Sequence, residues 1–296
     1  MDPIEVRGAR KRYGTIQAVD GLDVTVPEGT CVGLLGPNGA GKSTTMRMLT
    51  AQTVADAGTI HVLGHELPKD SKAARAKMGV VPQLDNLDIA LTVEQTLVMF
   101  CHLYGVTGKE RREAIDRCLA IGNLGDRADT RVDKLSGGMR RRLLIARSLV
   151  HQPRLVLLDE PTVGLDPQVR QELWGLIDDL RAGGASILMS THYIEEAERL
   201  CDTVLIMSQG RSVAEGPPAR LVREVVGSQV TEVYGPRAEL DAVESQMRAA
   251  GYKTRRTGTS VAVLGTESGN GDVPDGPTRV ASLEDVFVLL TGEVVE

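Results

Sequence analysis

The chain of 296 residues is long enough for one large domain or for two unequal ones with an extensive core. Its 34 basic and 40 acidic residues give a formal charge of −6, which excludes a global electrostatic attraction to nucleic acid. No charge-free apolar run approaches the roughly 18 residues of a spanning helix, so work at a membrane requires a second chain that crosses it.

The first third of the chain is predicted to be β-rich, because short apolar runs are separated there by Gly and Pro. The expected strands cover residues 4–7, 22–26, 30–35, 59–63 and 78–81. The third of these runs leads into a glycine-rich loop, and a stretch with helical spacing follows that loop.

The glycine-rich loop matches the phosphate-binding pattern G-x-x-x-x-G-K-[ST], in which the backbone wraps phosphate oxygens and directs its N–H groups inward. Lys42 supplies a charge to the outer phosphates, and Ser43 offers its hydroxyl to Mg²⁺ at the start of a helix. The pattern therefore predicts a nucleotide and Mg²⁺ site. The residues predicted to bind nucleotide here are Gly36, Pro37, Asn38, Gly39, Ala40, Gly41, Lys42, Ser43 and Thr44.

The middle of the chain is predicted to hold a helical insert, at about residues 84–150, because apolar residues recur there three and four apart. Val93, Leu97, Phe100 and Leu103 carry this pattern, and a second helix follows Ser136. Strands at 155–158, 186–189 and 203–207 then alternate with helices at 169–181 and 194–200. Such alternation predicts a parallel sheet covered by helices.

The pattern changes around Gly216-Pro217-Pro218, which predicts a main domain at 1–227 and a small α+β unit at 228–296. Strands are expected at 230–234, 252–256 and 260–264, with a helix at 238–250. Residues 266–278 are rich in Gly, Pro, Asp and Ser and predict a mobile loop. Ser282 can cap a last helix whose apolar stripe is expected to dock on protein.

Two adjacent acids, Asp159 and Glu160, follow the apolar strand that ends at Leu158. Open α/β sheets place their ligands at the carboxyl ends of strands, and successive strand residues point to different sides. We therefore expect two roles. Asp159 would orient Mg²⁺, and Glu160 would polarise the water that attacks the terminal phosphate.

The segment Leu135-Ser136-Gly137-Gly138 resembles the signature of ATP-binding cassette (ABC) ATPases, and the motifs between residues 4 and 226 occur in that family's order. The resemblance implies an α/β phosphate-loop NTPase core with a β-rich N-terminal part and a helical insert. It also implies that Tyr13 stacks on adenine and that Gln83 contacts Mg²⁺ and water. By the same resemblance Asp166 crosses a dimer interface, and His192 holds the terminal phosphate and Glu160.

The signature also has a physical interpretation, because Ser136 is a good N-cap and the glycines behind it leave backbone N–H groups uncovered at a helix start. The resemblance implies a head-to-tail pair of copies in which Ser136, Gly137 and Gly138 of each copy close on the ATP of the other. The nucleotide would then hold the dimer together.

Two positions depart from the family's usual pattern: Met139 stands where Gln is usual, and Val163-Gly164 replaces a small polar pair. Both variants resemble a bacterial subgroup that exports drugs, polyketides, lipids or lipo-oligosaccharides. The segment 282–287 is similar to that subgroup's C-terminal extension, and the segment 81–88 is similar to its nodulation-factor exporters. The neighbouring run Arg140-Arg141-Arg142 is interpreted as a solvated helix face, with contact to a partner or to acidic lipid as the alternative.

The four cysteines lie far apart with no C-x-x-C pair, which argues against a zinc site or a disulfide framework and predicts reduced thiols in a cytoplasmic protein.

Our leading hypothesis is an ATPase subunit at the inner face of the membrane that drives a separate transmembrane permease to export an amphipathic molecule. Residues 87–104 are where the family docks that partner. The alternatives are a soluble cassette ATPase of DNA repair or translation and a phosphate-loop kinase. The single cassette, without coiled-coil inserts or zinc cysteines, argues against the first, and the Ser-Gly-Gly signature argues against the second.

Overall fold

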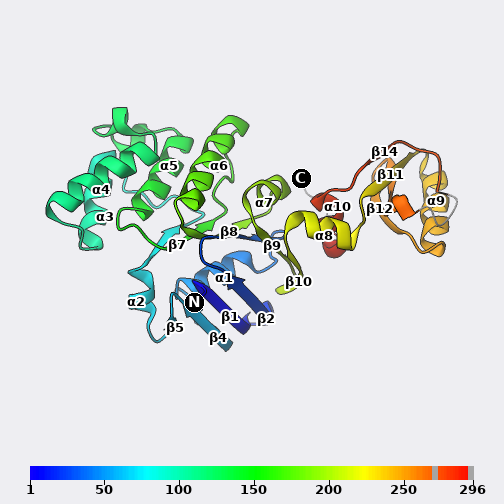
Figure 1. The fold of residues 1–296 in the computed structure, drawn as a ribbon, viewed down its shortest axis with the longest axis horizontal. Coiled ribbons are helices and arrows are strands. Elements are labelled where there is room, and N and C mark those ends of the chain that lie inside the picture. The colour runs from blue at the N-terminus through cyan, green and yellow to red at the C-terminus, as the bar shows by residue number, and fades with distance from the viewer. Residues whose placement is uncertain (269–272, 293–296) are drawn as a thin grey trace.

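Three β-sheets organise the part of the chain that the computed structural model describes, residues 1–268 and 273–292 (Figure 1). The first sheet is antiparallel, in the order β2-β1-β4-β5. Its strands are β1 (Ile4–Tyr13), β2 (Ile16–Val26), β4 (Ala57–Val62) and β5 (His65–Leu67). The strands β1 and β2 extend well beyond the short runs expected from the sequence, because polar residues continue the ladder past the apolar segments.

The central sheet has six strands in the order β10-β9-β3-β8-β7-β6 and is parallel except for β10. Its strands are β3 (Cys31–Leu35), β6 (Met78–Val81), β7 (Leu155–Asp159), β8 (Ser186–Thr191), β9 (Thr203–Ser208) and β10 (Arg211–Gly216). Every residue of β3 and β8 is buried, as parallel strands covered on both faces require. The expected α/β class is confirmed, and the antiparallel edge strand β10 is an addition to it.

Helices cover the central sheet and form the insert. Those within residues 1–227 are α1 (Lys42–Leu49), α2 (Ser71–Arg75), α3 (Val93–Leu103), α4 (Gly108–Ile121), α5 (Gly137–Ser148), α6 (Pro167–Ala182), α7 (Ile194–Leu200) and α8 (Pro218–Val225), with 3-10 turns η1 (Gly125–Arg127) and η2 (Val132–Lys134). Helix α1 contacts both β2 and the central strands β7 and β8. Helices α3, α4 and α5 pack on one another at one end of the molecule (Figure 1).

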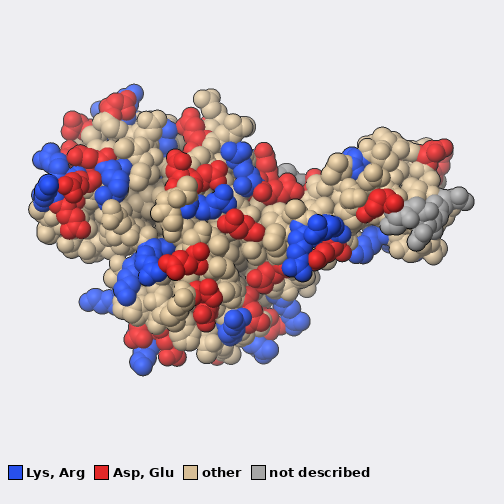
Figure 2. All heavy atoms as spheres, in the orientation of Figure 1, with Lys and Arg blue, Asp and Glu red and all other residues tan. Residues whose placement is uncertain are grey.

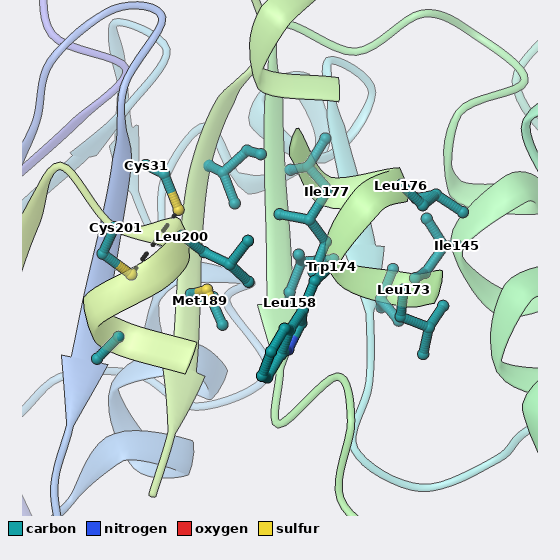
Figure 3. Packing of buried hydrophobic residues seen from close by; sticks show 14 of the residues in the cluster. Cys31, Ile145, Leu158, Leu173, Trp174, Leu176, Ile177, Met189, Leu200 and Cys201 are labelled. Atoms are coloured by element: carbon teal, nitrogen blue, oxygen red, sulfur yellow. Dashed lines mark hydrogen bonds between the residues drawn. The ribbon is translucent and has the colours of Figure 1, made fainter. Parts of the chain in front are cut away.

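The core lies on both faces of the central sheet. One cluster fills the space between this sheet and the first sheet, and includes Val6, Val24 and Leu34. The other lies beneath α6 and α7, where Trp174 packs among Leu158, Met189 and their neighbours (Figure 3). The central sheet is therefore held rigidly, and its carboxyl edge forms a fixed platform for loops.

The C-terminal sheet has the order β12-β13-β11-β14 and is antiparallel. Its strands are β11 (Gln229–Tyr234), β12 (Lys253–Thr257), β13 (Ser260–Leu264) and β14 (Thr278–Val280); α9 (Arg237–Ala249), the turn η3 (Thr266–Ser268) and α10 (Leu283–Thr291) complete the unit. The sequence missed η3, which lies in the stretch 266–278 expected to be a mobile loop, and β14, which begins at the last residue of that stretch. Residues 269–272 of the stretch lie outside the described residues.

Helix α10 returns to the part of the chain within residues 1–227, where it contacts α7, α8 and β9. Leu283, Val286 and Phe287 are buried in the same cluster that lies beneath α6, and the backbone N–H of Leu283 donates to Glu198 Oε1 at 2.9 Å. The expected apolar stripe thus docks on protein. The apolar core consequently continues from residues 1–227 into the unit proposed at 228–296.

Charged side chains of both signs are interspersed over the face shown in Figure 2, from the helical insert to the C-terminal unit. Within residues 1–268 and 273–292, no helix combines the length and the apolar character needed to cross a bilayer.

Candidate functional site

The glycine-rich loop joins β3 to α1 at the carboxyl edge of the central sheet. A Cβ atom on Gly36 would lie 2.6 Å from the carbonyl oxygen of Met207, and one on Gly41 would lie 2.5 Å from that of Ala18. Gly41 also has a φ of 104°, in the region that glycine adopts freely. The base of the loop is thus packed against β9 and β2, while Asn38 and Gly39 are exposed.

Lys42 projects back into this loop and is almost fully buried. Its Nζ atom donates to the carbonyl oxygens of Gly36 at 2.7 Å and Pro37 at 3.0 Å, and it lies 3.5 Å from Glu160 Oε1. The loop therefore carries a cation at its centre, next to the first turn of α1 with Ser43 and Thr44. This combination of a charge and a helix N-terminus suits phosphate oxygens.

Asp159 is the last residue of β7, and its side chain accepts a hydrogen bond from Ser190 Oγ of β8 at 2.6 Å. Burial raises the pKa of Asp159, the bond from Ser190 opposes that rise, and the nearby charge of Glu160 adds to it. The carboxylate is thus placed where a divalent cation would relieve the cost of its burial.

Glu160 follows with a φ of 45°, which turns the chain sharply and directs its side chain toward the loop. Its backbone N–H donates to the carbonyl oxygen of Ser190 at 3.1 Å and to its Oγ atom at 3.0 Å. The same serine therefore holds both acids: it donates to the carboxylate of Asp159 and accepts from the backbone of Glu160.

The carboxylate of Glu160 is the meeting point of the site. Gln83 Nε2 donates to Glu160 Oε2 at 2.8 Å, and His192 Nδ1 lies 3.5 Å from Glu160 Oε1, near Lys42. His192 follows β8 directly, and its Nδ1 atom is buried without a hydrogen bond. The amide of Gln83, the imidazole of His192 and the ammonium group of Lys42 thus surround the carboxylate of Glu160. This arrangement is suited to holding a water molecule against a phosphate.

The other residues predicted from the sequence lie outside this cluster. Ser136 caps α5 by accepting from the backbone N–H of Met139 at 3.2 Å, and Asp166 caps α6 by accepting from that of Val169 at 3.0 Å. A Cβ on Gly138 would lie 2.5 Å from Val169 Cγ1, so the first turns of α5 and α6 are side by side. Ser136, Gly137, Gly138 and Asp166 therefore form a second locus.

Tyr13 lies at the end of β1, where its side chain is largely exposed. Its hydroxyl is 3.3 Å from Thr53 Oγ1, in the segment that follows α1. The ring is accordingly placed on the surface, connected to the helix that begins at the phosphate loop.

The residues predicted to hold Mg²⁺ offer only oxygen donors: the hydroxyl of Ser43, the amide oxygen of Gln83 and the carboxylate of Asp159. Gln83 already uses its amide nitrogen toward Glu160, which leaves the oxygen as the atom suited to a cation. Among the described residues, no group of three or more His, Cys, Asp or Glu side chains could hold a metal. A donor set with one carboxylate fits Mg²⁺ that is bound together with phosphate oxygens.

The interpretation of Arg140-Arg141-Arg142 as a solvated face is wrong for Arg141, which is only 7% exposed. Its guanidinium donates to backbone carbonyls on both sides of the Gln83–Glu160 contact. The position gave a usable signal, because Leu144 and Ile145, three and four residues further along the helix, are core residues. Arginine at such a position faces the interior.

Sequence reasoning also missed Glu196 of α7, which is fully buried. It accepts hydrogen bonds from Trp174 Nε1 at 3.1 Å, from Thr191 Oγ1 at 2.5 Å and from Thr162 Oγ1. These donors come from α6, from the residue before His192 and from the segment after Glu160. Glu196 therefore ties the two loops of the site to the helices behind them.

Several known proteins are similar to this chain in sequence and in fold. A family model described as ABC transporter matches residues 19–163. Nod factor export ATP-binding protein I of Burkholderia orbicola (strain AU 1054) is 42% identical over 301 residues, which cover 99% of this chain and 98% of that protein. A solved ATP-binding subunit of an ABC transporter has a TM-score of 0.68 at 30% identity, covering 75% of this chain and 92% of the other. The ATP-binding cassette MJ0796, solved as a dimer in a post-hydrolysis state with ADP and Pi, has a TM-score of 0.65 at 26% identity, covering 72% and 98%.

Proposed function

This chain belongs to the ABC transporter family, and we propose that it is the ATPase subunit of an exporter, in which two copies work with a separate membrane subunit. The family membership predicted from the sequence is confirmed, and the name of the relative favours export over DNA repair or translation. The observation that carries the proposal is the convergence of Lys42, Gln83 and His192 on the carboxylate of Glu160.

In this proposal Glu160 is the general base, because its buried carboxylate is the acceptor toward which the amide of Gln83 and the ring of His192 point. Lys42 and the backbone of the phosphate loop hold the outer phosphates, and His192 Nδ1 is the atom available to the terminal one. Mg²⁺, held by Ser43, Gln83 and Asp159, would supply charge neutralisation of the phosphates.

The second locus supports a two-copy arrangement. The uncovered N-termini of α5 and α6, with Ser136 and Asp166 as their caps, are anion-binding ends of helices that lie apart from the Glu160 cluster. We propose that they meet the nucleotide held by the other copy, while Tyr13 stacks on the adenine held by its own copy. The cassette MJ0796, which has this fold and was solved as a dimer, supports a two-copy assembly.

The helical insert supports the membrane partner. Leu84, Ile89, Met99 and Leu103 are large apolar side chains that are exposed on or beside α3. A shallow groove next to them is lined by Val98, Met99 and His102. We propose that a cytoplasmic segment of a permease docks here, which would place the chain at the inner face of the membrane, and that the exported cargo is an amphipathic drug, lipid or lipo-oligosaccharide.

The hydrolytic half of the proposal is tested with Glu160→Gln, with Glu224→Gln on an exposed part of α8 as the control. We expect Glu160→Gln to bind ATP normally but to lose turnover by about 10²–10⁴-fold. ATP should then hold the variant as a dimer, which size-exclusion chromatography with light scattering detects. A monomer that hydrolyses ATP at the wild-type rate would contradict both the assigned base and the two-copy site.

The export half is tested by co-purification with the membrane fraction of the host. We expect an integral membrane protein to be retained by the wild-type chain and by Val213→Asp, whose site is exposed on β10. The substitutions Ile89→Asp and Leu103→Asp should release it. Retention that is unaffected by both substitutions would move the docking surface elsewhere, and the absence of any membrane protein from every preparation would argue against a transporter.

A further inference from the structure

A single buried guanidinium connects the two segments that carry Gln83 and Glu160. Arg141 Nε donates one hydrogen bond, at 2.6 Å, and Nη1 and Nη2 donate two each, at 2.6 to 3.2 Å. The acceptors are the backbone carbonyl oxygens of Pro82, Gln83, Asp159, Glu160 and Pro161. An arginine side chain has five N–H donors in a planar fork, so all of them are used.

These five carbonyls belong to only two stretches of chain, residues 82–83 and 159–161. The first leads from β6 toward the helical insert, and the second leads out of β7. Because one rigid fork holds both, the backbones of Gln83 and Glu160 are fixed relative to each other. The 2.8 Å hydrogen bond from Gln83 Nε2 to Glu160 Oε2 is made across this clamped gap.

Lysine cannot reproduce this arrangement, because an ammonium group has three donors at one point and no planar fork. The burial of a cation is costly, and burial lowers the pKa of Arg141 to about 10, while the nearby carboxylate of Asp159 opposes that shift. The guanidinium therefore stays charged at neutral pH. Residues buried at such a cost commonly serve a site and not the core alone.

Arg141 lies on α5, the helix that carries the signature. Ser136 caps α5, and Arg141 lies five residues further along, a little more than one turn from the cap. The helix end proposed to meet the second copy's nucleotide is therefore joined to the backbone of Glu160 by one rigid element. A shift of α5 would move both held segments together.

We propose that Arg141 is a positioning residue for ATP hydrolysis, which sets Gln83 against Glu160 from the signature helix. This inference rests on the proposed function, in which Glu160 is the base. Arg141 touches neither nucleotide nor water; it acts through the backbone of the two residues that do. Its loss should consequently affect the chemical step more than nucleotide binding.

The test uses the full-length chain with Arg141→Lys and Arg141→Gln. The matched control is Arg140→Lys, since Arg140 is the preceding residue on the helix and pairs with Asp85 on the surface at 3.2 Å. We expect both Arg141 variants to lower kcat by about 10-fold to 100-fold, because small misplacements of reacting groups carry penalties of this size. The Kd for ATP and the ATP-dependent dimer of the Glu160→Gln background should change little. The melting temperature should fall, because buried carbonyl groups lose hydrogen bonds, but stay above the assay temperature. The control should behave as wild type.

A double-mutant cycle separates positioning from a general structural role. If Arg141 acts through Gln83, then Arg141→Lys should lower kcat much less in a Gln83→Ala background than in the wild-type background. An unchanged kcat in the single variants, full additivity with Gln83→Ala, or melting below the assay temperature would each overturn the proposal. Loss of activity in Glu160→Gln with normal activity in Arg141→Lys overturns this inference alone, whereas a wild-type chain without ATPase activity overturns the proposed function and with it this inference.

Discussion

Two aspartates, the half-buried Asp159 at the nucleotide site and the fully buried Asp285 in the C-terminal unit, are stabilised in different ways. Asp285 is held by Arg279, whose Nη1 and Nη2 atoms lie 2.7 and 2.8 Å from its two oxygens, and Arg255 Nε lies 3.2 Å away. Burial alone would raise the pKa of Asp285, but these hydrogen bonds and charges lower it below the ordinary value. For Asp159 burial raises the pKa, and the opposing hydrogen bond comes from the neutral hydroxyl of Ser190.

On the proposed function, this difference separates a carboxylate that serves the fold, Asp285, from one that serves a ligand, Asp159. The C-terminal unit supplies its own cations, so Asp285 joins β14 to the start of α10 without help from outside the chain. On the proposed function, a bound cation would offset the cost of burying Asp159 at the nucleotide site. Sites commonly give up stability in this way, and the trade can be measured.

The largest expected effect is that of Asp159→Asn on turnover. We expect the Mg²⁺-dependent ATPase rate to fall by about 10²-fold or more, because the charge stabilisation contributed by a bound metal is worth several kcal/mol. The same substitution should raise the melting temperature of the nucleotide-free chain, since a half-buried charge is removed. ATPase assays and thermal unfolding without nucleotide measure the two effects, with the exposed Asp179→Asn as control. A lower melting temperature for Asp159→Asn would contradict the comparison.

The next effect is on stability alone. Asp285→Asn leaves two guanidinium groups facing a neutral side chain, and we expect a loss of about 3 kcal/mol, the lower end for breaking a buried ion pair, because Arg279 is partly exposed. Urea unfolding followed by circular dichroism measures this loss. The ATPase rate of the folded fraction should stay at the wild-type value.

A matched control lies in the same network. Glu284 pairs with Arg255 at 2.7 Å but is half exposed, so Glu284→Gln should cost only about 0–1 kcal/mol. If Glu284→Gln and Asp285→Asn destabilise the chain equally, burial is not what distinguishes these carboxylates.

The residues of the candidate nucleotide site were more predictable from the sequence than Arg141 and Glu196, which hold them in place. Gln83, Asp159, Glu160 and His192 were predicted because each occupies a fixed place in a motif, and the structure brings Gln83 and His192 to Glu160. Arg141 was misread, because three consecutive arginines look solvated unless the buried face of their helix is known. Its acceptors are backbone carbonyls, which carry no sequence signal, and the partners of Glu196 lie up to 34 residues away from it in the chain.

The same principle applies to the fold. Strands such as β3 and β8 were predicted because continuous apolar runs identify them. The strand β10 was missed because it is a mostly exposed edge strand with the sequence RSVAEG. The strand β14 was missed because it has only three residues, which follow a Gly- and Pro-rich stretch and show no strand pattern of their own. They form a strand by pairing with β11 in the tertiary structure.

A pH series should show the two aspartates acting with opposite sign. For Asp159 the pKa is raised on folding, so the nucleotide-free chain is favoured while that group is protonated, and this contribution is lost as the pH rises through the raised pKa. For Asp285 the pKa is lowered, so its contribution is present above the ordinary value of 3.8 and is lost as the pH falls through the lowered pKa.

The expected readout is the stability difference between each Asn variant and the wild type from pH 7 to pH 3. Asp159→Asn should be more stable than the wild type at pH 7, and this difference in stability should vanish as the pH falls toward 3.8. Asp285→Asn should be the less stable of its pair, and its deficit should shrink only below that value. Each group can contribute at most about 1.4 kcal/mol per pH unit. Differences of the same sign would remove the distinction between the two sites.

The smallest expected effect compares two helix caps. Ser136 Oγ accepts from the backbone N–H of Met139 at 3.2 Å, and Thr92 Oγ1 accepts from that of Gln95 at 3.1 Å. Replacement of either by Ala removes one capping bond and should cost about 1 kcal/mol of stability. Since each substitution removes one capping hydrogen bond, the two variants should lose similar stability. A difference in ATP-dependent dimerisation must then come from the surroundings of each cap. Ser136→Ala should weaken the ATP-dependent dimer of the Glu160→Gln chain, whereas Thr92→Ala should leave it intact, and light scattering across an ATP titration distinguishes the two. Equal dimerisation by both variants would show that the hydroxyl of Ser136 serves only the first turn of α5.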